Sequence, residues 1–104
     1  MAIKISNDQE FATDLKNNEN VVVKYYADWC GSCKLFSPKY KRLSEDERFK
    51  HISFLDINAE QCPEARQIAG VDTLPFFAIF KNGELVGKIS TTKEGSFIDL
   101  ISQL

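Results

Sequence analysis

Hydrophobic and polar residues follow two periods along the chain, one typical of strands and one typical of helices. The strand pattern is the clearer one. Residues 20–27, NVVVKYYA, form a nearly continuous apolar run rich in valine and tyrosine, which is typical of a strand covered on both faces. Residues 51–58, HISFLDIN, alternate as a strand does, and residues 2–5, AIKI, predict a short opening strand. The segment 75–89, PFFAIFKNGELVGKI, holds two apolar stretches joined by Asn-Gly, a strong hairpin signal. Five strands are therefore expected.

Helices are predicted where apolar positions recur every three or four residues. Phe36, Tyr40 and Leu43 have this spacing, and Pro38 inside the same helix is expected to kink it. Residues 62–70, CPEARQIAG, indicate a short helix with proline in its first turn and glycine as its stop.

Two further helices are predicted to begin at capping boxes. Ser6 with Gln9 opens the first of them, and Thr91 with Glu94 opens the last helix of the chain. The side chains that these helices are expected to bury are Phe11, Leu15, Phe97, Leu100, Ile101 and Leu104.

The resulting order is β-α-β-α-β-α-β-β-α. Helices between the early strands imply parallel pairing, and the hairpin adds antiparallel strands. We therefore expect an α/β sandwich whose mixed central sheet is flanked by helices on both faces. A chain of 104 residues without repeats or linkers suits a single domain over residues 1–104.

Composition and charge exclude several partners. The chain carries 13 basic and 15 acidic side chains, and this balance gives no electrostatic footprint for nucleic acid or an anionic membrane. No apolar run approaches the roughly 20 residues that cross a bilayer. The first residues, MAIKISNDQEF, lack the apolar stretch of a secretory signal, so we expect a cytoplasmic monomer.

The motif DWCGSCK, residues 28–34, carries the candidate chemistry. Cys30 and Cys33 lie where a buried strand ends and a helix begins, and the positive end of a helix favours a thiolate. One helical turn separates their Cα atoms by about 5 Å, which a disulfide can bridge. Cys30 can therefore attack a substrate disulfide, and Cys33 can resolve the mixed disulfide.

A metal site and a purely structural disulfide are weaker interpretations of the cysteine pair. Zinc requires four ligands, commonly as two close pairs, and the remaining candidates, Cys62 and His51, make no second pair. A structural disulfide is disfavoured in a reducing cytosol. We therefore expect a redox-active pair and no metal.

The segments YYADWCGSCKLFSPKYKRL and VDTLPFFAIFKNGELV resemble the thioredoxin family, and the resemblance covers nearly the whole chain. It implies the thioredoxin fold and a thiol-disulfide oxidoreductase, with Cys30 as nucleophile and Cys33 as resolving thiol of a redox-active disulfide. It also implies a cytosolic protein-disulfide reductase with no bound cofactor. Electrons would come from NADPH through a thioredoxin reductase and pass to oxidised protein substrates.

The resemblance also implies a substrate-binding surface. Pro75 matches a proline that family members hold in the cis form beside the active site. It would turn the backbone of Thr73 and Leu74 outward, where a substrate peptide can pair as an added strand. Trp29, Gly31 and Leu74 would supply a flat apolar contact surface.

The clearest departure from the family lies below the cysteines. Lys24 stands where thioredoxins usually carry a buried aspartate, and Asp56 stands where they commonly carry a lysine. We expect a buried ion pair with its charges exchanged, in which Asp56 accepts the proton of Cys33. The alternative is that Lys24 extends to solvent along its stem. A cation here would also stabilise the thiolate and make the protein a stronger oxidant.

Several smaller differences from the thioredoxin pattern have consequences that the sequence does not decide. Ser32 replaces the usual proline and offers a hydroxyl to the thiolate. Phe76 replaces a threonine and changes either substrate selectivity or core packing. Ser90 or Thr91 occupies a usual glycine position and narrows the range of partners. Cys62 at a helix start is either an oxidisable thiol of lowered pKa or a small buried one.

Two alternative functions remain open at this point. Ser32 and Lys24 favour a disulfide oxidase or isomerase, which the missing export signal disfavours. The chain could also be a thioredoxin-fold binding subunit with dispensable cysteines, against which the intact Cys30, Cys33 and Pro75 argue.

Overall fold

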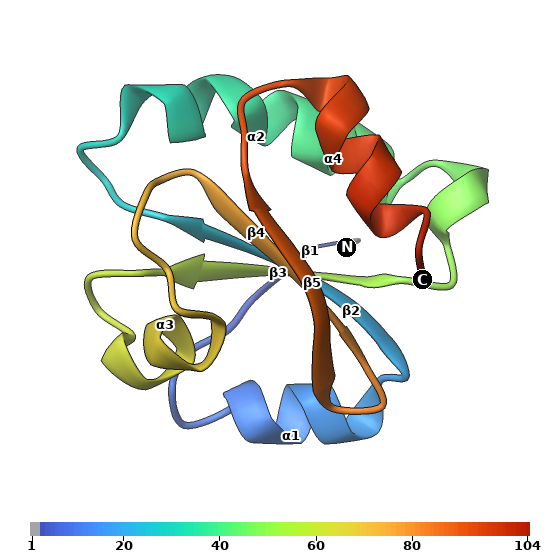
Figure 1. Ribbon diagram of the computed structural model, residues 1–104, viewed down its shortest axis with the longest axis horizontal. Helices are drawn as coiled ribbons and strands as arrows, with labels where there is room; N and C mark the ends of the chain where they lie inside the picture. Colours follow the sequence, from blue (N-terminus) through green and yellow to red (C-terminus); the bar gives the residue numbers. More distant parts are fainter. Residues whose placement is uncertain (1–2) are drawn as a thin grey trace.

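The computed structural model describes residues 3–104, and within that range one five-stranded sheet is covered by four α-helices (Figure 1). The strands are β1 (Ile3–Ile5), β2 (Asn20–Tyr26), β3 (Ser53–Asn58), β4 (Phe76–Lys81) and β5 (Glu84–Ser90). The helices are α1 (Phe11–Asn17), α2 (Gly31–Ser44), α3 (Pro63–Ala69) and α4 (Glu94–Ile101), with a 3₁₀ turn at Glu47–Phe49. This is the predicted order; only the start of the opening strand at Ala2 lies outside the described residues.

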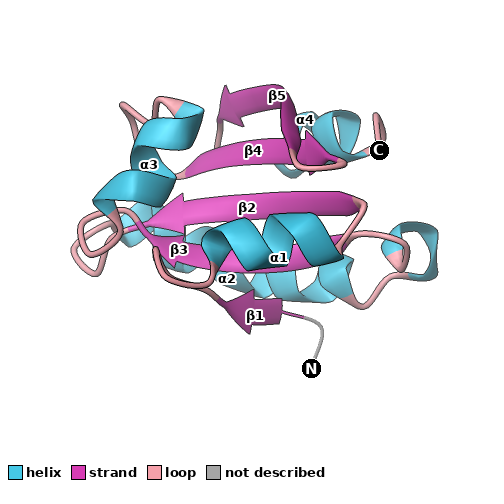
Figure 2. Ribbon diagram, turned by 90° about the horizontal axis from the view of Figure 1, so that it is seen from below, coloured by secondary structure: helices cyan, strands magenta, loops and turns pink. Residues whose placement is uncertain are grey.

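The sheet is mixed, as predicted. Its strand order is β1-β3-β2-β4-β5, with β1, β3 and β2 parallel and β4 and β5 antiparallel to their neighbours (Figure 2). β2 therefore lies at the centre, which explains its apolar run: five of its seven residues are buried. Asn82 and Gly83 have positive φ angles of 53° and 84°, as a tight hairpin between β4 and β5 requires.

Two hydrophobic clusters lie on opposite faces of the sheet. Helices α2 and α4 cover one face, and α1 and α3 cover the other (Figure 1). Residues of β2 alternate between the clusters, so that Val22 faces α2 and α4 while Val23 faces α1 and α3. The largest fully buried side chains of the α2 side are Phe36, Tyr40, Phe54, Phe77 and Phe97, all at most 1% exposed. No helix within residues 3–104 is long and apolar enough to cross a membrane.

The predicted capping box of the first helix is wrong by one residue. Asn7 accepts a hydrogen bond from the backbone N–H of Glu10 at 2.9 Å, and its amide donates to the Glu10 carboxylate at 3.2 Å. Ser6 instead donates to the buried carboxylate of Asp14 at 2.5 Å. Asn7 with Glu10 has the same spacing as the predicted pair, so the pattern alone does not select the register.

The predicted capping box of the last helix is also wrong. Thr91 accepts a hydrogen bond from the N–H of Lys93, two residues on, and Lys93 itself precedes the helix without a side-chain cap. The Glu94 carboxylate pairs with Arg42 of α2. Glu94 therefore links α4 to α2 instead of capping the N-terminus of α4.

Candidate active site

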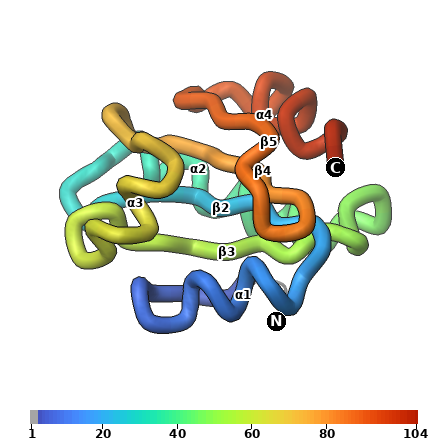
Figure 3. Tube along the Cα trace, turned by 60° about the horizontal axis from the view of Figure 1, so that its bottom comes forward, coloured from blue at the N-terminus to red at the C-terminus, as the bar shows by residue number. Residues whose placement is uncertain are grey.

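Three loops meet at one end of the sheet and form the candidate site. Because β2 and β3 are parallel and β4 is antiparallel to β2, the ends of the first two strands lie beside the start of the third. The loops that follow β2 and β3 and the loop that precedes β4 therefore gather at the same edge (Figures 1 and 3). The sheet topology thus brings the motif of residues 28–34 next to Pro75.

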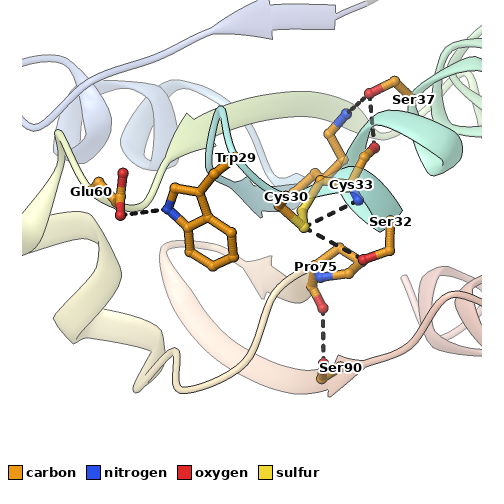
Figure 4. The surroundings of a disulfide bond; sticks show 9 residues. Trp29, Cys30, Ser32, Cys33, Ser37, Glu60, Pro75 and Ser90 are labelled. Carbon is orange, nitrogen blue, oxygen red and sulfur yellow. Dashed lines mark hydrogen bonds between the residues drawn. A yellow bond between two sulfur atoms is a disulfide. The ribbon is translucent and has the colours of Figure 1, made fainter.

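The two cysteines form a disulfide at the beginning of α2, with their Cα atoms 5.3 Å apart (Figure 4). Cys30 is the N-cap of the helix, and its Sγ accepts a hydrogen bond from the backbone N–H of Cys33 at 3.2 Å. The hydroxyl of Ser32 lies 3.5 Å from the same sulfur. A thiolate at Cys30 would keep both contacts and would also face the positive end of the helix.

The two cysteines are buried, whereas the glycine that follows Cys30 is exposed. Both cysteines are buried, at 4% exposure for Cys30 and 2% for Cys33, and they pack with Ala27 and the half-buried Leu74. Gly31 between them is exposed, and a Cβ placed on it would meet no atom within 4 Å. The surface over the disulfide is therefore open to another chain.

Pro75 lies beside the disulfide, and the Leu74–Pro75 peptide bond is cis (Figure 4). The hydroxyl of Ser90 on β5 donates a hydrogen bond to the Pro75 carbonyl at 2.9 Å. Of the two residues expected to replace a glycine in this stretch, Ser90 is the one that contacts the proline loop. Thr73 is exposed on the same loop, as the predicted peptide-pairing surface requires.

Exposed apolar side chains stand on both sides of the cysteine pair in the sequence. Trp29 is 68% exposed, and its indole N–H donates a hydrogen bond to the Glu60 carboxylate at 2.6 Å (Figure 4). Leu35 on the first turns of α2 is 79% exposed. Neither Glu60 nor Leu35 is among the residues predicted from the sequence. The available signal for Leu35 is its place beside Phe36 in the helical period, which turns it away from the core.

The expected ion pair below the cysteines is present. Lys24 and Asp56 are partners in the register of β2 and β3, and Lys24 Nζ lies 3.5 Å from Asp56 Oδ1. Lys24 is 3% exposed, so the alternative in which its stem leads the ammonium to solvent is wrong. Both side chains point to the α2 face, because they share the alternation of Val22 and Phe54.

Burial and the partner charge oppose each other in this pair. Burial lowers the pKa of the Lys24 ammonium, and Asp56 raises it in part. Burial likewise raises the pKa of the Asp56 carboxyl, and Lys24 lowers it in part. The ammonium also lies 4.9 Å from the ring centre of Tyr40, whose own pKa is raised well above its usual value by burial and by Asp56.

Ser37 is a site residue that the sequence patterns did not reveal. Its hydroxyl is 2.8 Å from Lys24 Nζ and donates to the backbone carbonyl of Cys33 at 3.1 Å (Figure 4). The available signal was its spacing, four residues after Cys33, which places it on the same face of α2.

Two residues whose roles the sequence left open, Phe76 and Cys62, are buried in the hydrophobic core. Phe76 is buried at 5% exposure and meets Tyr25 edge to face, with ring centres 6.2 Å apart, so it changes core packing. Cys62 is 5% exposed, and burial raises the pKa of its thiol, so the small buried thiol is confirmed over the alternative of an oxidisable thiol of lowered pKa. His51 is exposed, and residues 3–104 hold no cluster of three metal-ligating side chains.

Comparison with known proteins places this arrangement in one family. The sequence model of the family described as Thioredoxin matches residues 2–103. The chain belongs to the thioredoxin family. With the Cys30–Cys33 pair at the start of α2, membership makes it a thiol-disulfide oxidoreductase that works by dithiol-disulfide exchange.

Individual thioredoxins are similar over most of their length. Thioredoxin-1 of Schizosaccharomyces pombe is 33% identical over 86% of this chain and 84% of its own, and human thioredoxin is 31% identical over 89% and 87%. The structure of Plasmodium falciparum thioredoxin, 27% identical, superposes with a TM-score of 0.89 over 96% of this chain and 97% of its own. Another similar chain, 27% identical with a TM-score of 0.88 over 98% and 95%, comes from work on thiol resolution in yeast mitochondrial 1-Cys peroxiredoxin.

Proposed function

We propose that this thioredoxin is a protein-disulfide reductase that takes electrons from NADPH through a flavoprotein thioredoxin reductase. The observation that carries the proposal is the Cys30–Cys33 pair at the positive end of α2, directly preceded by the exposed Trp29. Thioredoxins need no bound cofactor, because the two sulfur atoms hold the two electrons that are transferred.

The reaction proceeds in two exchanges. The Cys30 thiolate attacks one sulfur of a substrate disulfide, which forms a mixed disulfide and releases the other substrate sulfur as a thiolate that takes up a proton. Cys33 then loses its proton and attacks the Cys30 sulfur. This step closes the Cys30–Cys33 disulfide and frees the second substrate thiol, so two electrons have moved from the protein to the substrate.

The proton of Cys33 requires an acceptor, and we assign this role to Asp56. Its buried Oδ1 makes no hydrogen bond of normal length within residues 3–104, and the Lys24 ammonium stays 3.5 Å away, which leaves room for a proton on this atom. Lys24 is the charge partner that stabilises the ionised carboxylate in its buried position. Asp56→Asn removes the acceptor and is expected to slow substrate reduction at pH 7, whereas an unchanged rate would exclude Asp56 as the base.

Substrate peptides bind across the cysteines in this proposal. The backbone of the exposed Thr73 and the half-buried Leu74, next to Pro75, pairs with the peptide as an added strand. Trp29 and Gly31 supply the apolar and unobstructed part of the surface. The partners in this proposal are oxidised proteins, and nucleic acid and membranes are not among them. The protein acts on them as a monomer.

We place this activity in the cytoplasm. In its reducing environment a third, unpaired cysteine such as Cys62 is stable, and a dithiol can be regenerated. A peroxide-reducing thiol enzyme is a substrate of suitable chemistry, since a similar chain was studied together with a peroxiredoxin.

The test is a coupled assay in which NADPH oxidation is followed with insulin as the disulfide substrate and a thioredoxin reductase as electron source. We expect NADPH consumption that depends on the protein and disappears in Cys30→Ser. Cys33→Ser is expected to stop at a mixed disulfide through Cys30, detectable by mass spectrometry. Consumption that persists in Cys30→Ser would contradict the proposed nucleophile.

A disulfide oxidase or isomerase is the second candidate, because the buried Lys24 ammonium favours the thiolate form. The same preparation would then reactivate scrambled ribonuclease faster than it reduces insulin. We expect the opposite order, since Asp56 offsets the lysine charge.

A further inference from the structure

The hydroxyl of Ser37 occupies a junction between the helix and the buried ion pair. It lies one turn after Cys33 on α2, 3.1 Å from the Cys33 carbonyl oxygen and 2.8 Å from Lys24 Nζ. A hydroxyl has one proton to donate, and a carbonyl oxygen can only accept. Ser37 therefore donates to Cys33 and accepts a hydrogen bond from the Lys24 ammonium.

This hydrogen bond draws the ammonium away from its charge partner. Lys24 Nζ is 2.8 Å from Ser37 Oγ but 3.5 Å from Asp56 Oδ1. Asp56 Oδ1 is buried and makes no hydrogen bond of normal length among the described residues, because Lys24 Nζ stays 3.5 Å away. A contact closed to about 2.8 Å would be usual for a charge-assisted hydrogen bond.

We propose that Ser37 is a positioning residue of the thiol-disulfide exchange: it holds the Lys24 ammonium against α2 and so keeps Asp56 Oδ1 unoccupied for the Cys33 proton. The inference rests on the proposed role of Asp56 as acceptor. Ser37 touches neither sulfur nor substrate in this mechanism, and it acts only through the position of Lys24.

Few other ionisable groups face Asp56, so a change in its titration midpoint can be attributed to Lys24. On β2 these are Lys24 and Tyr26, and on α2 it is Tyr40, while the residue opposite Asp56 on β1 is the apolar Ile5; Cys33 is tied in the disulfide of the oxidised protein and does not titrate there. Burial raises the pKa of both tyrosines, so neither changes charge in the range where a carboxyl titrates.

Ser37→Ala tests the inference, with Ser37→Thr as the variant that keeps the hydroxyl. Without the hydroxyl, Lys24 Nζ is expected to close on Asp56 Oδ1, from 3.5 Å to about 2.8 Å. At an effective dielectric constant of about 20, that approach lowers the pKa of Asp56 by roughly one unit. Ser44→Ala is the matched control, because it removes a hydroxyl that bonds a backbone carbonyl of the same helix far from the pair.

The first readout is the side-chain carboxyl of Asp56, titrated by NMR in the oxidised protein, which requires no activity. We expect the midpoint to fall by about one pH unit in Ser37→Ala and to keep its wild-type value in Ser37→Thr and Ser44→Ala. An unchanged midpoint in Ser37→Ala would overturn the inference and leave the proposed reductase function standing.

The second readout is the pH dependence of the second exchange, the resolution of the mixed disulfide by Cys33, followed in a single turnover. Its acid limb reports the base that takes the Cys33 proton, so it is expected to move to lower pH by the same amount in Ser37→Ala. The shift should vanish when Ser37→Ala is combined with Asp56→Asn. A shift that survives Asp56→Asn would show that Ser37 acts by another route and would also overturn the inference.

Discussion

Replacing Lys24 by methionine tests the energetic role of the buried ion pair. Methionine has a similar length, so the change removes the charge and leaves most of the packing. Asp56 then remains buried without its cation, and breaking a buried pair in this way costs about 3–5 kcal/mol. The Asp56 side chain is still 20% exposed, so we expect the lower end, about 3 kcal/mol.

The measurement is urea unfolding of the oxidised protein at pH 7. With a dependence of about 1.5 kcal/mol per molar urea for a domain of this size, the midpoint falls by about 2 M. Lys50→Met is the control: Lys50 pairs with Glu47 on the surface at 77% side-chain exposure, and its loss costs less than about 0.5 kcal/mol. Lys24→Met with Asp56→Leu removes both charges and is expected to recover most of the loss.

The loss should also depend on pH, with a definite sign. Burial raises the pKa of Asp56, and Lys24 is the group that lowers it again, so the pKa rises further in Lys24→Met. A carboxyl whose folded-state pKa lies above its unfolded value destabilises the protein above that pKa and ceases to do so below the unfolded value. The difference between the variant and the wild type should therefore shrink as the pH falls from 7 toward about 4. A midpoint equal to the wild type at pH 7 would refute the reasoning.

Three further predictions concern the core, the proline loop and the third cysteine. Gly87→Ala places a Cβ 3.2 Å from side chains of β4 and α4 and is expected to cost about 1–3 kcal/mol in thermal unfolding, whereas Gly31→Ala, with no atom within 4 Å, should leave the stability unchanged. Equal melting temperatures for the two variants would contradict this packing. Ser90→Ala removes the hydrogen bond to the Pro75 carbonyl and should lower the free energy of unfolding by about 1 kcal/mol in urea, and an unchanged midpoint would show that this bond contributes nothing. Cys62 should resist iodoacetamide at pH 7 in folded protein lacking the other two cysteines and react fully in urea, because burial raises its pKa; rapid labelling of the folded form would contradict this.

The fold and the central chemistry follow from local patterns in the sequence. The strand and helix periods, together with the predicted helix starts, located the five strands and four α-helices within residues 3–104, but not the 3₁₀ turn at Glu47–Phe49. The position of Cys30 and Cys33 between a buried strand and a helix follows from the same pattern. Their meeting with Pro75 was implied by the family resemblance alone, because it depends on a strand order that no local pattern specifies.

The Lys24–Asp56 pair was predicted from the family resemblance, and the register of β2 and β3 confirms it. Both residues were assigned from the family resemblance, and the parallel pairing of β2 with β3 then places them side by side on one face. Ser37 was missed because its contact with Lys24 depends on how α2 is rotated above the sheet. That rotation is set by the packing of buried side chains such as Phe36 and Tyr40, which no local pattern specifies.

The helix starts show a second limit of local patterns. Both predicted capping boxes had acceptable residue types, yet Ser6 bonds the buried Asp14 and Glu94 bonds Arg42 of another helix. Each of these side chains found a partner distant in sequence that satisfies it better than the nearby backbone. The spacing of polar residues cannot anticipate such a partner, because the partner depends on the assembled fold.

The central claim is that Cys30 and Cys33 form a working redox couple of reductase type. The most direct test is the equilibrium reduction potential of this pair, obtained by titration of the protein in dithiothreitol buffers with the thiol state read by mass spectrometry. We predict a reversible two-electron transition near about −270 mV, the level of a thioredoxin, with Asp56 offsetting the charge of Lys24. A potential near about −120 mV, or a pair that never closes, would contradict the claim.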